Sequence, residues 1–317
     1  MTVQSTRSSA TDNAEAAGNL ETAQSGSRIA NDPRRVTVKD TLTGAQVVIN
    51  ASRQARPNLP VTSCPFCPGG LEAPEPYDVF WFKNRWPAMP AETCEVVLYA
   101  QQHDASFWSL GTDGARKVID LWAERTEALG SRDDIEYVLI FENRGAEVGA
   151  TIAHPHGQIY AFGEIPPAPL KELVDGYLSP SEIDPALIVS ESGDWRAWVP
   201  EAAVYPYELR IAPTGNVGSL TDDSCDRDRL AATLVDSLAR LDQLFDEEMP
   251  YMLWIHQRPS DGHDWPDHRL HFHITPLRRG PGVTRFVAAA ELGAQVYFNP
   301  VQPSVAADQL RRLPGLR

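Results

Sequence analysis

Apolar positions along the first half of the chain follow strand-like and helix-like patterns in turn. An apolar run at 95–100 precedes a helical pattern over 113–129, which Gly130 closes. Two further strand-like runs follow at 135–143 and 154–161. Because alternation is typical of strands and a 3.6-residue period of helices, this half predicts the order strand, helix, strand, strand.

The second half repeats this order of elements. A strand-like run at 207–213 is followed by a helical pattern over 226–245 and by strand-like runs at 251–257 and 268–276. We interpret the match as duplication of a module in which an antiparallel sheet is backed by a helix. Coincidence is the alternative because this order is common. A histidine pair at the end of each copy favours duplication.

The N-terminal part differs in composition. Residues 1–30 are rich in Ser, Thr, Ala, Gly and Asn and hold no aromatic residue, which predicts a disordered tail. Two β-rich runs around Gly44, within 36–51, predict a hairpin. We therefore expect an α+β protein with a tail, a first module at 31–180 and a second module at 181–317.

Charge limits the partners that the protein can bind. The chain has 43 acidic and 28 basic residues, a net charge of -15 and a pI near 4.9. Such a surface disfavours nucleic acid, although a local arginine cluster can still hold a small phosphorylated substrate. No segment reaches the roughly 18 apolar residues of a membrane span, and the first residues lack the apolar core of a secretion signal. We expect a cytoplasmic protein with no membrane partner.

The strongest candidate chemistry lies in the segment FENRGAEVGATIAHPHGQIYAF. It places His154, His156 and Gln158 at alternate positions, so that in a strand they project from one face. One core and one surface histidine would be the ordinary structural interpretation. The pair followed by Gln and flanked by Gly149 and Gly157 instead favours a phosphate site, because glycine lets the backbone approach a phosphate closely.

A close cysteine pair suggests a metal. Cys64 and Cys67 form a C-x-x-C pair, a spacing that lets two thiolates bind one tetrahedral ion, while Cys94 and Cys225 are scattered. In a reducing compartment such a pair indicates a metal half-site before it indicates a disulfide. Because no second pair follows at zinc-finger spacing, the spacing alone leaves a role without metal open.

The histidine-bearing segment resembles the active-site segment of galactose-1-phosphate uridylyltransferases, which are enzymes of the histidine-triad class. The resemblance runs from about Asp32 to the C-terminus and is supported by the segments SRQARP, CPFC, FKNRWPA, YMLWIHQRP and LHFHITPL. Ala150 and Thr151 stand where relatives often have Cys and Ser, and Thr keeps a hydroxyl for phosphate contact. The resemblance implies two fused histidine-triad-like modules that move UMP between UDP-glucose and galactose 1-phosphate.

The resemblance also implies roles for individual residues. His156 matches the family's nucleophile, which carries UMP in a ping-pong exchange, and a neutral imidazole is a competent nucleophile near pH 7. Gln158 can donate a hydrogen bond to a phosphoryl oxygen. Without the resemblance, the two arginines near residue 55 could equally be a solvated surface pair. The positions that match substrate contacts in the family are Arg53, Arg56, Asn143, Gly149, Thr151, Arg285, Phe286 and Glu291.

Two metal sites are implied in the same way. The family completes the cysteine pair with histidines matched by His103 and His154, and a Cys2His2 set favours zinc. A second set suits iron or zinc, with a buried polar cluster left from the duplication as the alternative. Its members are Glu172, His256, His271 and His273.

Three functions stay open from the sequence. The resemblance favours a homodimeric uridylyltransferase acting on a UDP-sugar and a sugar 1-phosphate, with sites completed across the subunit interface. A related ADP-sugar phosphorylase or adenylyltransferase, or a transferase for another sugar 1-phosphate, comes second. A non-catalytic nucleotide-binding homologue is third, and retention of His156 and Gln158 argues against it. The sequence offers no P-loop and no G-x-G-x-x-G motif for other nucleotide chemistry.

Overall fold

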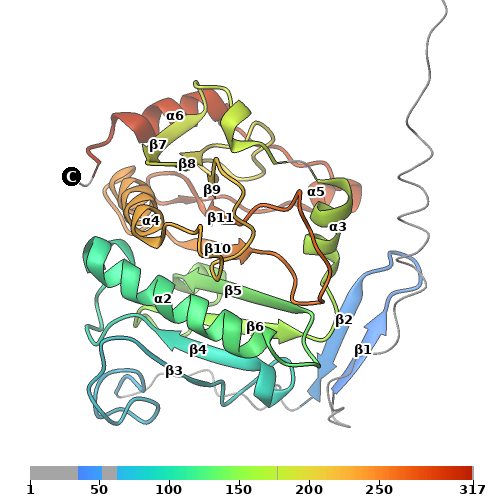
Figure 1. Ribbon diagram of the computed structural model, residues 1–317. Helices are drawn as coiled ribbons and strands as arrows, with labels where there is room; N and C mark the ends of the chain where they lie inside the picture. The colour runs from blue at the N-terminus through green and yellow to red at the C-terminus, as the bar shows by residue number, and fades with distance from the viewer. Residues whose placement is uncertain (1–34, 52–62, 177, 316–317) are drawn as a thin grey trace, which may run out of the picture.

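The computed structural model describes residues 35–51, 63–176 and 178–315. The predicted tail at 1–30 lies outside these ranges. A nine-stranded antiparallel sheet forms the centre of the molecule, with the strand order β3-β4-β6-β5-β10-β11-β9-β8-β7 (Figure 1). Within the described ranges, no helix combines the length and apolar character needed to cross a bilayer.

In the strand order of this sheet, the strands of the first half of the chain come first and those of the second half follow, so each half of the chain forms one lateral half of the sheet. The central sheet comprises β3 (Phe80–Lys83), β4 (Cys94–Leu98), β5 (Tyr137–Arg144), β6 (His156–Phe162), β7 (Ile188–Ser192), β8 (Trp195–Trp198), β9 (Leu209–Pro213), β10 (Tyr251–His256) and β11 (His271–Pro276). Two further strand pairs stand apart from it, β1 (Arg35–Lys39) with β2 (Gln46–Asn50) and β12 (Arg278–Gly280) with β13 (Val283–Thr284). The helices of the described chain are α2 (Gly111–Gly130), α3 (Pro167–Asp175), α4 (Arg227–Gln243), α5 (Ala289–Ala294) and α6 (Pro303–Arg312).

The predicted repeat of elements is present, and its two copies join in one sheet. Phe141 of β5 and Trp254 of β10 face each other across the pair that joins the halves. Gln158 of β6 lies opposite Phe141, and His273 of β11 lies opposite Trp254. A local twofold axis between β5 and β10 therefore relates the two copies, and it matches Gln158 with His273. The α+β class is confirmed, while the module boundary near residue 180 stays a prediction.

One face of the sheet is covered by α2 and α4, which run side by side (Figure 1). The α4 helix begins where the Asp226 side chain accepts a hydrogen bond from the backbone N–H of Arg229 at 3.0 Å, which satisfies one of the unpaired donors of the first turn. Leu230, Leu234 and Leu238 repeat at four-residue spacing and project into the core.

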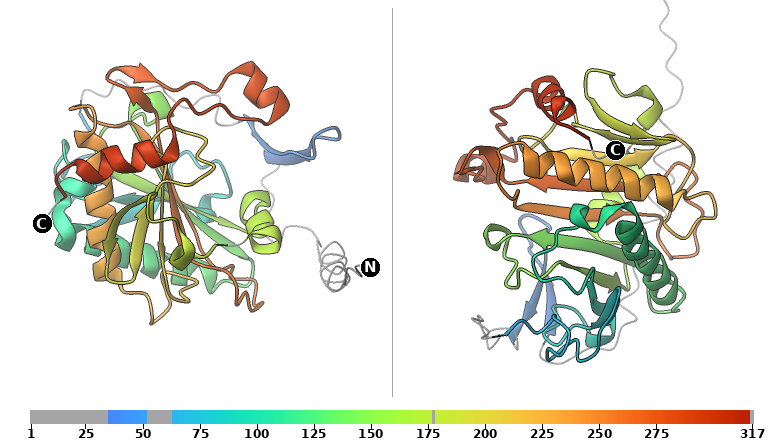
Figure 2. Two further views of the ribbon diagram at one scale, coloured as in Figure 1. Left: turned by 90° about the horizontal axis from the view of Figure 1, so that it is seen from above. Right: turned by 90° about the vertical axis from the view of Figure 1, so that its left-hand side faces the viewer.

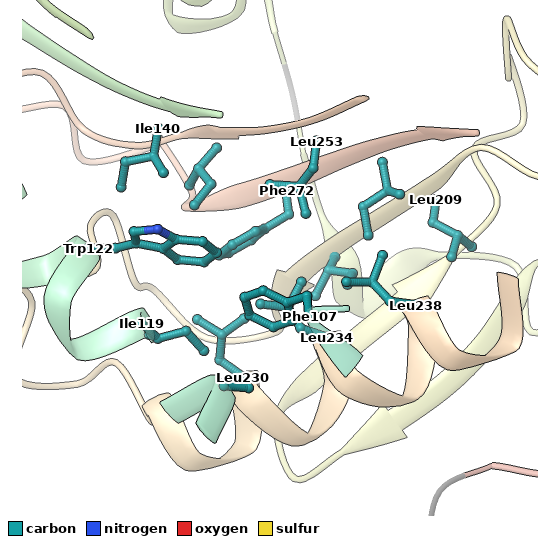
Figure 3. Packing of buried hydrophobic residues seen from close by; sticks show 14 of the residues in the cluster. Phe107, Ile119, Trp122, Ile140, Leu209, Leu230, Leu234, Leu238, Leu253 and Phe272 are labelled. Carbon is teal, nitrogen blue, oxygen red and sulfur yellow. The ribbon is translucent and has the colours of Figure 1, made fainter. Parts of the chain in front are cut away.

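The hydrophobic core is continuous between the two copies. Trp122 of α2 lies among side chains from both halves, including Ile140 of β5 and Phe272 of β11 (Figure 3). Burying apolar surface contributes about 25 cal/mol per Å² to the free energy of unfolding. Because each copy buries part of its apolar surface against the other, the stability of one copy depends on the other.

The opposite face of the sheet carries the candidate site. On β6, Gly157, Ile159 and Ala161 are buried towards the helices, whereas the alternate residues from His156 to Phe162 are half-buried on the other face. The hairpin β1–β2 and the helices α3 and α5 lie on that side (Figure 2). One detail of the expectation was wrong: the strand begins at His156, so His154 precedes it.

Candidate active site

His156, the first residue of β6, is held in one orientation. Its Nδ1 lies 2.8 Å from the backbone oxygen of His154. Because a carbonyl oxygen only accepts hydrogen bonds, Nδ1 carries the proton and the lone pair is on Nε2. The Phe66 ring packs edge-on against the imidazole, with 5.1 Å between centroids. The imidazole is thus presented as a base or nucleophile through Nε2.

Gln158 is fixed by a residue that the sequence analysis did not single out. The side-chain amide of Asn84 donates to Oε1 of Gln158 at 3.2 Å. This contact turns the amide nitrogen of Gln158 away from Asn84, as a donor for a phosphoryl oxygen. Asn84 follows β3, and only the sheet order β3-β4-β6 brings it to β6. The segment FKNRWPA supports the family resemblance as a whole, but an asparagine after a strand is an ordinary turn residue, so nothing marked Asn84 individually.

The loop between β5 and β6 (residues 145–155, the β5–β6 loop) forms one wall of a cleft of about 510 Å³. Gly145 and Gly149 have φ of 100° and 84°, a region where other residues are strained. Asn143, Thr151 and His156 all line this cleft. The structure therefore gathers three of the predicted site residues, with Gly149 in the same loop.

The predicted sugar-contacting residues lie elsewhere in this chain. Arg285, Phe286 and Glu291 are not among the residues that line the cleft. The Glu291 carboxylate is bound by the Arg285 guanidinium and by the backbone N–H groups of Ala288 and Phe298 at 2.8 and 2.9 Å. The hydrogen bond from Arg285 lowers the pKa of Glu291. Phe286 is exposed. The predicted phosphate contacts Arg53 and Arg56 lie outside the described residues.

Cys64, Cys67, His103 and His154 form one group of candidate metal ligands. Their donor atoms all lie within 4.8 Å of one another, and Cys67 Sγ is 3.6 Å from Nδ1 of each histidine. Nε2 of His154 lies 2.7 Å from the Ala100 carbonyl oxygen, so it carries the proton and Nδ1 is left to bind an ion. Burial lowers the pKa of His154, which favours the neutral imidazole that metal binding requires. The residues present fit a tetrahedral ion.

Glu172, His256, His271 and His273 form a second such group. Oε2 of Glu172 lies 2.5 Å from Nδ1 of His256 and 3.3 Å from Nε2 of His271. Nε2 of His273 is buried, has no hydrogen-bond partner, and lies 3.7 Å from Oε1 of Glu172. Burial lowers the pKa of His273 to about 2. A neutral, unsatisfied imidazole nitrogen beside a carboxylate fits a metal ligand.

Comparison with known proteins identifies the family. The family models for the N-terminal and C-terminal domains of galactose-1-phosphate uridyl transferase match residues 83–166 and 170–316. A galactose-1-phosphate uridylyltransferase of Thermotoga maritima is 34% identical over 305 residues, which cover 85% of this chain and 96% of the relative.

Solved structures extend the comparison to the fold. A uridylyltransferase structure aligns with a TM-score of 0.78 and 27% identity over 87% of this chain and 97% of its own. An ADP-glucose phosphorylase of Arabidopsis thaliana has the same fold, with a TM-score of 0.70 at 22% identity over 88% of this chain and 99% of its own.

Together with the fold, these matches define an enzyme of the nucleotidyl-transferring class. The chain belongs to the galactose-1-phosphate uridylyltransferase family. The family inferred from the histidine-bearing segment is confirmed, whereas the roles of the individual residues are proposals.

The close approach of Tyr99 to β6 yields a first prediction. A Cβ at Gly157 would lie 2.1 Å from the Tyr99 hydroxyl oxygen, so in Gly157→Ala either Tyr99 or the strand must move. Because the Tyr99 ring is buried against Phe107 and Trp122, we expect the strand between His156 and Gln158 to shift. Because an error of about 1 Å in a catalytic group can cost roughly 100-fold, we expect transferase kcat/KM to fall by about that factor. Steady-state kinetics on the purified variant would measure it.

Tyr99→Phe supplies the matched control, because it removes the atom in conflict. The next nearest atoms to the added Cβ are Tyr99 Cζ at 3.0 Å and the Phe141 carbonyl oxygen at 3.1 Å, so the double variant should recover only part of the activity. Full activity in Gly157→Ala alone would show that β6 tolerates the shift and that this spacing does not matter for catalysis.

Proposed function

We propose that the enzyme moves UMP from UDP-glucose to galactose 1-phosphate through a covalent intermediate on Nε2 of His156. The observation that carries this proposal is the contact between Nδ1 and the His154 carbonyl oxygen, which puts the lone pair on Nε2. Splitting the transfer into two displacements at one phosphorus replaces a difficult step with two easier ones.

The two displacements balance without a further reactant. Nε2 of His156 attacks the α-phosphorus of UDP-glucose, the bond from that phosphorus to the bridging oxygen breaks, and glucose 1-phosphate leaves. A phosphate oxygen of galactose 1-phosphate then attacks the same phosphorus and the N–P bond breaks. UDP-galactose forms and the imidazole returns to its starting state.

The other predicted residues would bind and stabilise charge. The amide nitrogen of Gln158 is directed by Asn84 and would donate to the phosphoryl oxygens as charge develops. Backbone N–H groups around Gly149 and the hydroxyl of Thr151 would hold the phosphates. The arginines at 53 and 56 would bind phosphate oxygens bidentately.

A second candidate is transfer from an ADP-sugar, as in an ADP-sugar phosphorylase. The fold shared with an ADP-glucose phosphorylase favours keeping this alternative. A panel of UDP-, ADP- and GDP-sugars, each offered with phosphate and with several sugar 1-phosphates, separates the two by kcat/KM.

We further propose that the group around Cys64 and Cys67 holds zinc and that the group around Glu172 holds iron or zinc. A bound ion at the first group would fix the ring of His154 and so the carbonyl that orients His156. A reducing, cytoplasmic compartment would keep the cysteines available as thiolates, and both are free here.

We also propose a homodimer whose sites are completed across the interface. The hairpin β1–β2 exposes apolar side chains on its surface, among them Val36, Val38 and Ile49, and Leu292 and Phe298 are exposed on and beside α5. Apolar surface of this kind marks interfaces. Both regions lie on the side of the sheet that carries the candidate site (Figure 2). The chain passes directly from β2 to the two predicted phosphate arginines.

The covalent intermediate can be tested with α-labelled UDP-glucose. Wild-type enzyme should retain acid-labile label on the protein, and His156→Asn should retain none, because the amide is no nucleophile. His263→Asn is the control, since that side chain is exposed and lies outside the cleft. Label that persists on His156→Asn would exclude His156 as the nucleophile.

The zinc group predicts a linked loss of metal and stability. The variant carrying both Cys64→Ser and Cys67→Ser should lose about one zinc per chain and unfold at a lower temperature, because binding free energy adds to folding free energy. Elemental analysis with thermal unfolding measures both. Cys225→Ser should keep the metal, since Cys225 lies outside both groups. Unchanged zinc content in the double variant would refute the assignment.

Subunit mixing tests the shared site. His156→Asn chains mixed with chains carrying Arg53→Ala and Arg56→Ala should regain part of the lost activity if the arginines act in trans. One of the two sites in each mixed dimer would then hold both the nucleophile and the arginines. Sedimentation at assay concentration reports the assembly, and a fully active monomer would overturn the shared-site proposal.

A further inference from the structure

The Arg278 guanidinium joins three segments that lie far apart in the sequence. One terminal nitrogen donates to Oε1 of Glu147 at 2.7 Å, and the other donates to Oγ1 of Thr284 at 2.6 Å. Nε lies 3.5 Å from Oε1 of Glu247, which also accepts the backbone N–H of Gly282 at 2.9 Å. Both terminal nitrogens of the guanidinium are therefore hydrogen-bonded to partners from the two halves of the chain, while the buried Nε has no hydrogen-bond partner.

Two of these partners belong to segments with proposed substrate contacts. Glu147 lies in the short 3-10 helix Ala146–Val148 of the β5–β6 loop and itself lines the cleft, as do Asn143 and Thr151. Thr284 is the last residue of β13 and directly precedes the segment 285–291, which contains the predicted sugar contacts. Arg278 thus connects the β5–β6 loop, which is proposed to bind phosphate, to the segment 285–291, which contains the predicted sugar contacts.

A second contact holds the same loop against the second half. Gly145 begins the loop, and a Cβ there would lie 2.8 Å from Cβ of Pro250, the residue before β10. The backbone N–H of Leu277 donates to the Pro250 carbonyl oxygen at 2.8 Å, directly before Arg278. The loop therefore contacts the second half at two points, at Arg278 and at Pro250, and Pro250 is itself hydrogen-bonded to the residue before Arg278.

We propose that Arg278 is a positioning residue that sets the β5–β6 loop relative to the segment 285–291, through Glu147 on one side and Thr284 on the other. This inference rests on the proposed function, since it takes those two segments to contact the substrate. Arg278 itself does not line the cleft and acts through its partners.

The energetics separate positioning from stability. The Arg278 side chain is 15% exposed and that of Glu147 is 41% exposed. A half-exposed ion pair contributes little to the free energy of unfolding. The effect of the pair on kcat/KM is larger, because the loop residues bind substrate only when they are correctly placed. Removing the pair should therefore change substrate binding more than the unfolding temperature.

A double-mutant cycle tests the proposal. Glu147→Gln and Arg278→Gln should each lower kcat/KM for UDP-glucose by about tenfold, mostly through a higher KM, and the double variant should show about the same loss as either single one. The unfolding temperature should change little in Glu147→Gln, whereas the two variants that lack Arg278 also lose the hydrogen bond to Thr284 and should unfold at a somewhat lower temperature. Arg279→Gln is the matched control, since this exposed neighbour on the same strand should leave kcat/KM unchanged.

Two outcomes would overturn the inference. Losses that multiply in the double variant would mean that the two side chains act independently, and wild-type kcat/KM in Arg278→Gln would mean that the loop is set without it. The dissociation constant of UDP-glucose, measured by calorimetry across the same cycle in a His156→Asn background that forms no covalent intermediate, gives the coupling without turnover. If the wild-type enzyme takes up no label on His156, the proposed function fails, while the binding cycle still decides the role of Arg278.

Discussion

The contact between Nδ1 of His156 and the carbonyl oxygen of His154 is the constraint on which the proposed chemistry depends. It selects the tautomer with the lone pair on Nε2. The position of that carbonyl depends in turn on the His154 ring, which is anchored by the Ala100 carbonyl oxygen and by Tyr77, with Cys67 beside it. His154, Pro155 and His156 thus connect the candidate metal group, through the backbone, to the nitrogen proposed to attack the substrate.

The same contact, between Nδ1 of a histidine and the carbonyl oxygen two residues earlier, occurs in both copies of the module. His271 has the register position of His156, and its Nδ1 lies 2.7 Å from the Arg269 carbonyl oxygen, two residues earlier, as His156 lies against His154. In the first copy this orientation leaves Nε2 for the proposed transfer. In the second copy Nε2 lies 3.3 Å from Glu172, in the second candidate metal group. One strand geometry therefore orients both the proposed nucleophile and a histidine of the second candidate metal group.

The two copies differ from independent domains because they share hydrogen bonds and core. The pairing of β5 with β10 makes a single sheet, and α2 and α4 pack together on one face. That leaves the other face for polar side chains, with the β5–β6 loop at its edge. Ion pairs between the halves, such as Arg144 with Asp242 at 2.6 Å, add fixed geometry near the cleft.

The sequence by itself determined the local features. Periodicity gave the helices α2 and α4 and the main strands, and Gly44 marked the first hairpin, because these depend on side chains close together in the chain. The spacing of His154, His156 and Gln158 favoured a phosphate site, while the proposed transfer chemistry came from the family resemblance. The C-x-x-C pair predicted half of a candidate metal group but could not supply its histidines, which came from the family resemblance.

Only the tertiary structure decided which distant residues meet. Asn84 reaches Gln158 because β3 and β6 pair with opposite edges of β4. Arg278 and Glu147 are in contact although 131 residues separate them in the sequence. The joining of both copies in one sheet, and the satisfaction of the Glu291 carboxylate by its own segment, were likewise not visible in the sequence. Such contacts depend on strand order and on the path of loops, which are set by the packing of the whole core and leave no periodic signal in the chain.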